Sequence, residues 1–121
     1  MKESTIKDKS LKFAVRMVKL YKFLAEDKNE FVMSKQLLKC GTSIGANIRE
    51  GDYAESKSDF IHKYSIAQKE CNETIYWLEL LYLSKYLTKT EFESINKDCV
   101  ELMKLLTSII KTAKKSLTIN H

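Results

Sequence analysis

The chain has 121 residues, with 21 lysines and arginines against 16 aspartates and glutamates, so its formal net charge is +5. It has no proline and only three glycines, while 44% of its residues are hydrophobic. This composition excludes collagen-like, disulfide-scaffold and low-complexity chains. It also disfavours a turn-rich all-β fold, because tight turns need the backbone angles that proline and glycine supply. At this length we expect one helical domain spanning residues 1–121.

The first predicted helix covers residues 5–25. Apolar side chains recur along it at the three- and four-residue spacings of a buried helix face. They are Phe13, Ala14, Met17, Val18, Tyr21, Leu24 and Ala25. The opposite side carries a basic stripe that consists of Lys9, Lys12, Arg16 and Lys19. We therefore expect an amphipathic helix with a positively charged outer face.

The second predicted helix covers residues 34–50 and contains an unusual run of small residues. Six of the seven residues from Cys40 to Ala46 are small. Glycine inside a helix costs roughly 1 kcal/mol relative to alanine, so Gly41 and Gly45 are expected to mark a face where another helix comes close. Gly51 is expected to end the helix, because glycine adopts the left-handed conformation without a Cβ clash.

The third predicted helix covers residues 57–87, and the fourth covers residues 89–115. Each begins with a capping-box pattern, in which side chains bond the free N–H groups of the first turn. The two patterns are Ser56-x-x-Asp59 and Thr88-x-x-Glu91. Both helices carry more apolar surface than one core stripe requires.

Four amphipathic helices joined by short links predict an all-α, antiparallel up-down-up-down four-helix bundle. Surplus aromatic residues such as Trp77 and Tyr86 suggest that copies of this bundle associate through an apolar interface. The predicted fold is therefore a single-domain bundle that forms a homo-oligomer.

The sequence contains no constellation of residues for catalysis. Bundle metal sites need repeated acid–histidine pairs from facing helices, whereas this chain has one such pair, Asp59 and His62. Gly41-x-x-x-Gly45 lacks the Lys-Ser or Lys-Thr that completes a phosphate-binding loop. We therefore expect no enzyme activity, catalytic residue, metal site, cofactor or small-molecule substrate.

Three widely spaced cysteines, Cys40, Cys71 and Cys99, lie among apolar neighbours and form no CxxC pair. Free cysteines in such surroundings behave as small hydrophobic residues, so we expect them in the core. No apolar run has the quality of a signal peptide or a membrane span. A reducing cytoplasm, without membrane contact, is the expected location.

Positive charge is concentrated at both ends of the chain. Residues 1–22 carry a net charge of +5 and residues 102–121 carry +4, while the middle is mildly acidic. Such ends suit contact with nucleic-acid phosphates; the alternative is that lysine-rich faces only keep the protein soluble. Since only two of the 21 basic residues are arginine, weak backbone contact is expected rather than base readout. The candidate nucleic-acid-binding residues are Lys9, Lys12, Arg16, Lys19, Lys104, Lys111, Lys114 and Lys115.

One stretch of the chain resembles a known family. Residues 43–51 read Ser-Ile-Gly-Ala-Asn-Ile-Arg-Glu-Gly, and Phe60 and the run Ile-Ala-Gln-Lys-Glu at residues 66–70 follow. This pattern is similar to that of bacterial four-helix-bundle proteins encoded within intervening sequences of 23S ribosomal RNA genes, also called S23 ribosomal proteins. The similarity covers residues 36–87 in motifs and nearly the whole chain in helix layout. The residues that match the family motif are Ser43, Asn47, Glu50, Gly51 and Glu70.

The resemblance implies a ring-forming homo-oligomer, specifically a pentamer. It also implies a fold related to the accessory proteins of diversity-generating retroelements, which are basic pentamers associated with a reverse transcriptase and nucleic acid. Five copies would together carry a charge of about +25. The expected function is non-enzymatic, with weak binding of RNA or another nucleic acid through basic helix faces. The alternative is a protein-interaction scaffold with no nucleic-acid role.

Two residues of the motif have an expected structural role. Asn47 lies near the end of the second predicted helix, where its amide could bond free carbonyl groups. Glu50 could face the N-terminus of the third helix, where a negative charge is favoured by the helix dipole. The alternative is that both residues form a polar corner that contacts RNA or a protein partner.

Overall fold

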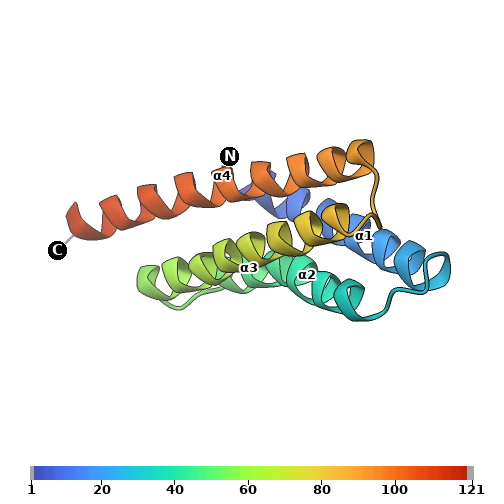
Figure 1. Cartoon of the computed structure of the whole chain (residues 1–121). Helices are drawn as coiled ribbons and strands as arrows, with labels where there is room; N and C mark the ends of the chain where they lie inside the picture. Colours follow the sequence, from blue (N-terminus) through green and yellow to red (C-terminus); the bar gives the residue numbers. More distant parts are fainter. Residues whose placement is uncertain (1, 120–121) are drawn as a thin grey trace.

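The computed structural model describes residues 2–119, and the side chains of residues 5–118, as four α-helices with short connections (Figure 1). They are α1 (Lys2–Glu26), α2 (Val32–Asp52), α3 (Lys57–Leu83) and α4 (Lys89–Ile119). None of the described residues lies in a β-strand. The prediction of an all-α fold with four helices is therefore confirmed. Within residues 2–119, no helix has the length and apolar character that crossing a membrane requires.

Each helix packs along two neighbours. α1 lies against α2 and α4, and α3 also lies against α2 and α4. The backbones of the diagonal pairs, α1 with α3 and α2 with α4, do not come close within the described part of the chain. The four helices therefore form a closed circuit in the order α1, α2, α3, α4, and each turns one face to the core and another to solvent.

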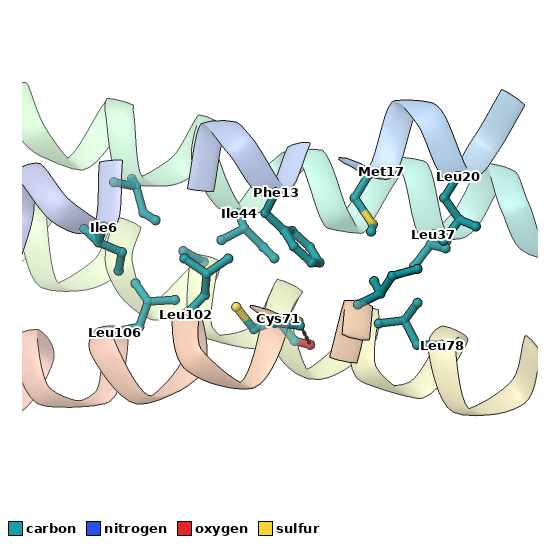
Figure 2. Packing of buried hydrophobic residues seen from close by; sticks show 14 of the residues in the cluster. Ile6, Phe13, Met17, Leu20, Leu37, Ile44, Cys71, Leu78, Leu102 and Leu106 are labelled. Carbon is teal, nitrogen blue, oxygen red and sulfur yellow. Dashed lines mark hydrogen bonds between the residues drawn. The ribbon is translucent and has the colours of Figure 1, made fainter. Parts of the chain in front are cut away.

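Apolar side chains from all four helices fill the core (Figure 2). Phe13 and Met17 enter it from α1, Ile44 from α2, Cys71 from α3 and Leu102 from α4, and each is at most 2% exposed. Burying one large apolar side chain stabilises a fold by about 1.5–3 kcal/mol. The three- and four-residue spacings read from the sequence thus correspond to the inward faces, except at Val18 of α1, which was predicted on the buried face and is 41% exposed.

α3 ends earlier than the predicted limit of residue 87. Its last residue is Leu83, and Lys85 then adopts a left-handed φ of 68°. The N–H of Tyr86 donates to the carbonyl of Leu81 at 2.9 Å, which is the bond of a Schellman motif. That motif usually has glycine at the left-handed position, so a lysine there gives no stop signal in the sequence. Leu87 turns back into the core, where it is 4% exposed.

The first turns of α3 and α4 are capped as predicted. Ser56 Oγ accepts the N–H of Asp59 at 3.0 Å. Thr88 Oγ1 accepts the N–H of Glu91 at 3.2 Å, and Glu91 Oε1 accepts the N–H of Thr88 at 2.8 Å. The second pair is a complete capping box, in which each residue satisfies an N–H of the other.

α2 begins with a cap that the sequence pattern did not indicate. The residue before the helix, Phe31, makes no side-chain cap. Instead the buried carboxylate of Glu30 accepts the N–H groups of Val32, Met33 and Ser34 at 3.0, 3.0 and 2.7 Å. A carboxylate bonded by three N–H groups is well placed at the positive end of the helix dipole.

The small-residue run of α2 lies where α1 comes close. A Cβ added at Gly41 would lie 2.5 Å from Cγ of Met17. A Cβ added at Gly45 would lie 3.3 Å from Oγ and 3.4 Å from the carbonyl oxygen of Ser10, which is itself 1% exposed. Both glycines therefore allow side chains and backbone of α1 to approach α2.

Candidate nucleic-acid interface

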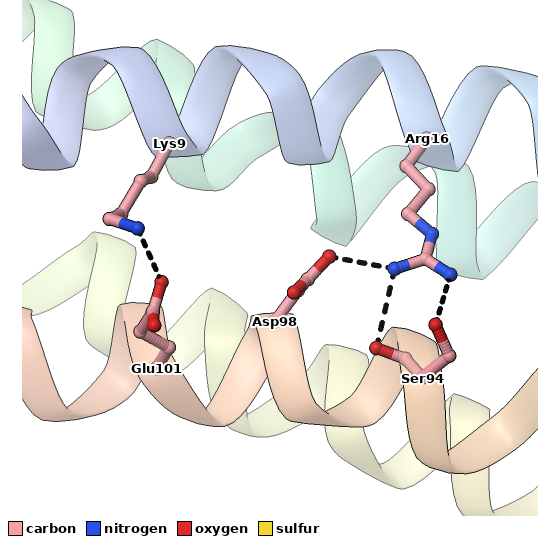
Figure 3. A network of polar contacts seen from close by, with 5 residues as sticks. All are labelled: Lys9, Arg16, Ser94, Asp98 and Glu101. Atoms are coloured by element: carbon pink, nitrogen blue, oxygen red, sulfur yellow. Dashed lines mark hydrogen bonds and ion pairs between the residues drawn. The ribbon is translucent and has the colours of Figure 1, made fainter.

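Two of the eight candidate basic residues form ion pairs between α1 and α4 (Figure 3). Lys9 Nζ lies 2.8 Å from Glu101 Oε1, and the hydrogen bond and charge of Glu101 raise the pKa of Lys9 above its ordinary value. Arg16 Nη1 lies 2.7 Å from Asp98 Oδ2. The two carboxylates balance half of the positive charge that α1 contributes to the candidate set.

The Arg16 guanidinium is held at three points on α4. Besides Asp98, it donates from Nη1 to the carbonyl oxygen of Ser94 at 3.2 Å and from Nη2 to Ser94 Oγ at 2.6 Å. A lysine could not reproduce this fork, because its ammonium group is a single point charge. The Arg16 and Asp98 side chains are 36% and 50% exposed, and such pairs contribute at most about 1 kcal/mol. The network therefore serves mainly to orient α1 along α4.

The two other α1 candidates, Lys12 and Lys19, are exposed. They border a groove of about 460 Å³ between α1 and α4, whose lining also includes Lys9, Asp98 and Glu101. Because the two acids of α4 face the basic residues of α1 across this groove, it does not offer phosphates a wholly positive surface.

The four α4 candidates, Lys104, Lys111, Lys114 and Lys115, are all exposed. Within residues 5–118, none of the four forms an ion pair, and residues 102–121 contain no acidic residue. In Figure 1 this part of α4 continues past the N-terminal end of α1. It is therefore a positive surface with no acidic residue in its own segment, although lysines near a helix C-terminus also complement the helix dipole.

A cleft of about 880 Å³ opens beside these lysines, between the α2–α3 connection and the last turns of α4. Phe60 and Ile109 contribute apolar surface to it, and Lys57 Nζ donates to Ser116 Oγ at 3.0 Å between its two walls. Asp52 and Glu55 also line the cleft. Their carboxylates would repel phosphate, so the cleft is not part of the candidate interface.

The family-motif residues bond within the subunit and do not form one exposed site. Asn47 Nδ2 donates to the carbonyl of Ser43 at 2.8 Å, so it bonds a carbonyl one turn back in α2 and not the free carbonyls at the helix end. Glu50 pairs with Lys63 of α3 at 3.2 Å, and the N-terminus of α3 is capped by Ser56 instead. These two expected contacts were therefore wrong, because α2 extends further than predicted.

Gly51 lies inside α2 and does not end it, contrary to the prediction. No glycine of the described chain has a positive φ. A Cβ at Gly51 would lie 2.7 Å from Cδ1 and Cε1 of Tyr64, a fully buried residue that donates its hydroxyl to Asp52 Oδ1 at 2.6 Å. The position needs glycine because an aromatic ring occupies the space of a side chain.

Glu70, the last motif residue, is half-buried on α3. Burial, followed by repulsion from Glu73, raises the pKa of its carboxyl above the ordinary value, while Lys39 and Lys69 act in the opposite direction. The carboxyl of Glu70 therefore holds its proton more tightly than an exposed glutamate does.

The metal-ligating residue types are dispersed. Within the described residues, no three or more histidine, cysteine and acidic side chains are placed to hold a metal ion. Cys40, Cys71 and Cys99 are free and buried, which confirms the predicted core role. His62 is exposed, and the second histidine, His121, lies outside the described residues.

A family model described as 23S rRNA-intervening sequence protein matches residues 2–108. The chain belongs to this family. The resemblance carried by residues 43–51 is thus confirmed. A 1.70 Å crystal structure of a protein with unknown function from the S23 ribosomal protein family of Bacteroides thetaiotaomicron is similar to it. The two chains are 62% identical, the match covers 92% of this chain and 99% of that one, and the TM-score is 0.91. No curated protein matches the chain.

The sequence alone did not reveal the α4 partners of the α1 basic stripe. Lys9 and Arg16 are two helical turns apart, and Asp98 and Glu101 are one turn apart on another helix. These spacings are compatible with pairing, yet only the register of α1 on α4 shows which residues meet. The available signal was a row of basic residues on one helix and a pair of acidic residues on a helix that packs against it.

Proposed function

We propose that this 23S rRNA-intervening sequence protein is a non-enzymatic, cytoplasmic homo-oligomer that binds RNA weakly through the phosphate backbone. The observation that carries the proposal is the exposed segment of α4 from Lys104 to Lys115, which has four lysines and no acidic residue. Lys12 and Lys19 of α1 would contribute further, weaker phosphate contacts, because Asp98 and Glu101 line the same groove. The three free, buried thiols fit a reducing compartment.

We further propose that the subunit is an antiparallel up-down-up-down bundle and that five subunits form a ring. Contacts between residues far apart in sequence support the antiparallel course. Along α1 and α4, Lys9 pairs with Glu101 and Arg16 with Asp98, so numbers rise in one helix as they fall in the other. The pentamer rests on the family resemblance. Light scattering tests it, since a particle of 14.1 kDa would contradict any oligomer.

The α4 segment suits phosphate contact for a physical reason. Eleven residues of helix separate Lys104 from Lys115, which is about 16 Å at 1.5 Å per residue. Each lysine that neutralises a phosphate releases a counterion, and for single strands the slope of log affinity against log salt is about 0.7 per contact. Four contacts per subunit therefore predict a slope of about −3, with little dependence on base sequence.

The experiment is an RNA titration by fluorescence anisotropy across a salt series. One variant replaces Lys104, Lys111, Lys114 and Lys115 with glutamine, and the matched control replaces four exposed lysines elsewhere, Lys28, Lys35, Lys39 and Lys85. Both lose the same net charge. Only the α4 variant should lose affinity and reduce the salt slope. Equal losses would mean a general charge effect, and no binding by the wild type at low salt would remove the proposed function.

The alternative function, a protein-interaction scaffold with no nucleic-acid role, is favoured by one observation. Lys9 and Arg16 are already paired with acids, so part of the basic surface serves the fold. Capture from a bacterial lysate with and without nuclease treatment separates the two functions. Proteins retained after nuclease treatment, together with failure of the RNA titration, would favour the scaffold.

A further inference from the structure

α1 has a second apolar face that the core does not use. Leu11, Val15 and Val18 are 54%, 48% and 41% exposed. They are spaced by four and three residues, so they share one side of the helix. Beside them a shallow hollow of about 290 Å³, which includes Leu11 and Ala14, lies between α1 and α2. Three large aliphatic side chains on one solvent-exposed helix face are typical of an interface.

α3 has a comparable outward face. Tyr76 and Leu83 are 57% and 73% exposed and are seven residues apart, so they lie on one side of the helix. A depression of about 610 Å³ between α3 and α4 lies next to the tyrosine, and its lining includes Glu73 and Met103. Its lining also includes Lys69, Gln68 and Asn72, so the recess is partly apolar and carries one acidic and one basic side chain.

The two faces carry opposite charges. Lys7, Lys12, Lys19 and Lys22 lie around the α1 face together with one acid, Asp8, so the surroundings of this face are net positive. From residue 69 to residue 83, α3 carries three glutamates, Glu70, Glu73 and Glu79, and one lysine. Burial is the first cause of the raised pKa of Glu70 and the charge of Glu73 is the second, while Lys39 and Lys69 of the same subunit act in the opposite direction. Lysines from another copy would add to these two positive partners.

We propose that the α1 face of one copy docks on the α3 face of the next. This inference rests on the proposed homo-oligomer and adds its contact surface. Because α1 and α3 occupy opposite corners of the bundle, their outward faces point away from each other. A contact between two different faces is heterologous. Such contacts form a ring when the rotation from one copy to the next brings the last copy back to the first. The opposite charges favour this pairing over α1 with α1 or α3 with α3.

This arrangement brings the edge of α4 at Met103 into the contact and leaves the lysines of α4 outside it, at the same corner of every copy. The lysines from Lys104 to Lys115 would then repeat around one surface of the assembly. The apolar patch of α1, by contrast, would be buried together with nearby lysines. The α1 candidates Lys9, Lys12, Arg16 and Lys19 line the groove toward α4, so they stay at the edge of the contact and can still add to the nucleic-acid set on α4.

The test uses two variants that each destroy one face. Val15→Glu places a negative charge opposite the acidic α3 face, and Tyr76→Glu places one in the α3 face itself. Glutamate is a good helix former, and both positions are exposed, so circular dichroism should show an intact fold. Val32→Glu and Tyr53→Glu, at positions 75% and 82% exposed, are the matched controls.

The wild type and both controls should form the same oligomer in light scattering. Each test variant alone should be monomeric. An equimolar mixture of the two should form a one-to-one complex of about twice the monomer mass, because one intact α1 face and one intact α3 face remain. The two remaining damaged faces both carry glutamate and should not pair.

Several outcomes would overturn the inference. Dissociation by Val15→Glu but not Tyr76→Glu would indicate a symmetric α1–α1 contact, and unchanged assembly of either variant, or no complex in the mixture, would also contradict it. If a glutamate variant unfolds, Val15→Ser and Tyr76→Ser replace it under the same criteria. A monomeric wild type would refute the proposed oligomer itself, a result distinct from all of these.

Discussion

The ring of Tyr64 lies so close to Gly51 that any side chain at residue 51 would overlap it. A Cβ there would lie 2.7 Å from two ring carbons, and the ring cannot move freely because Tyr64 is fully buried and bonded to Asp52 at 2.6 Å. Gly51→Ala should therefore lower the free energy of unfolding by about 1–3 kcal/mol despite its better helix propensity. Urea unfolding at matched protein concentration measures this.

Gly45→Ala is the control for that prediction. The nearest atom to its added Cβ would be Ser10 Oγ at 3.3 Å, which a small shift can accommodate. The gain in helix propensity, about 1 kcal/mol, should then leave the stability unchanged or slightly higher. A loss as large as that of Gly51→Ala would show that the contact with Tyr64 is not the cause.

Removal of the Glu30 carboxylate should weaken the start of α2. The side chain is 7% exposed and accepts three backbone N–H groups, which would lose a buried partner in Glu30→Ala. We expect a loss of about 1–3 kcal/mol in the free energy of unfolding. Glu26→Ala, at an exposed position, should change it by less than about 0.5 kcal/mol. Similar effects of the two substitutions would contradict the capping role.

Local rules predicted the helices, whereas contacts between helices decided the details. Apolar spacing identified the inward face that includes Phe13 and Met17, and Thr88-x-x-Glu91 marked a helix start because both partners lie within one turn. The end of α3 was missed because the left-handed position holds Lys85 and not glycine. The role of Gly51 could not be predicted from local rules either, because glycine is needed there to make room for the ring of Tyr64, thirteen residues away in the chain.

The candidate interface shows the same division. Net charge and the absence of acids after Glu101 can be read from the sequence. The exposure of Lys111 could also be predicted, because the apolar spacing of the helix places this lysine on the outward face. The pairing of Arg16 with Asp98 could not be read, because it depends on which turns of α1 and α4 lie side by side. Val18 was predicted on the buried face for the same reason, but it is 41% exposed and belongs to the outward apolar face with Val15.

Neutralising the α4 acids should strengthen the proposed RNA binding. Asp98→Asn with Glu101→Gln frees Arg16 and Lys9 from their ion pairs. Two additional phosphate contacts should tighten binding on the order of three- to tenfold at low salt and steepen the salt slope. Glu26→Gln with Asp27→Asn produces the same change in net charge at a distant, exposed site and should have a smaller effect. Equal effects would mean that the ion pairs do not withhold charge from RNA.

The thiols of the native protein should react slowly with alkylating reagents. Burial raises the pKa of Cys40 to about 11, and the pKa of Cys71 is also raised, by its hydrogen bond with Cys99 and by burial. Since the thiolate is the reactive form, labelling at pH 8 should be slow and should accelerate with urea as the fold opens. A Ser58→Cys variant, at an exposed position, supplies a rapidly labelled control. Rapid native labelling of all three thiols would contradict their place in the core.

Glu70→Gln should stabilise the isolated subunit at neutral pH. Burial and the charge of Glu73 raise the pKa of Glu70 above its ordinary value. The folded protein therefore holds the proton of the Glu70 carboxyl more tightly than the unfolded chain does. The free energy of unfolding that protonation of Glu70 adds is fully present below the pKa of the unfolded chain. It is lost as the pH rises through the pKa of the folded protein. The test is made in the Val15→Glu background, which is chosen to be monomeric. At pH 7, adding Glu70→Gln should raise the midpoint of thermal unfolding above that of Val15→Glu alone. The difference should vanish below the ordinary glutamate pKa of about 4.3.

The same substitution distinguishes the isolated subunit from the assembly. If lysines of a neighbouring copy lie near the α3 acids, they compensate the charge of Glu70, so Glu70→Gln should raise the midpoint less in the wild-type background than in the Val15→Glu background. Glu55→Gln, at an exposed position away from both faces, should have the same small effect in each. A gain from Glu70→Gln that is equal in the two backgrounds would show that assembly brings no positive charge to this part of α3.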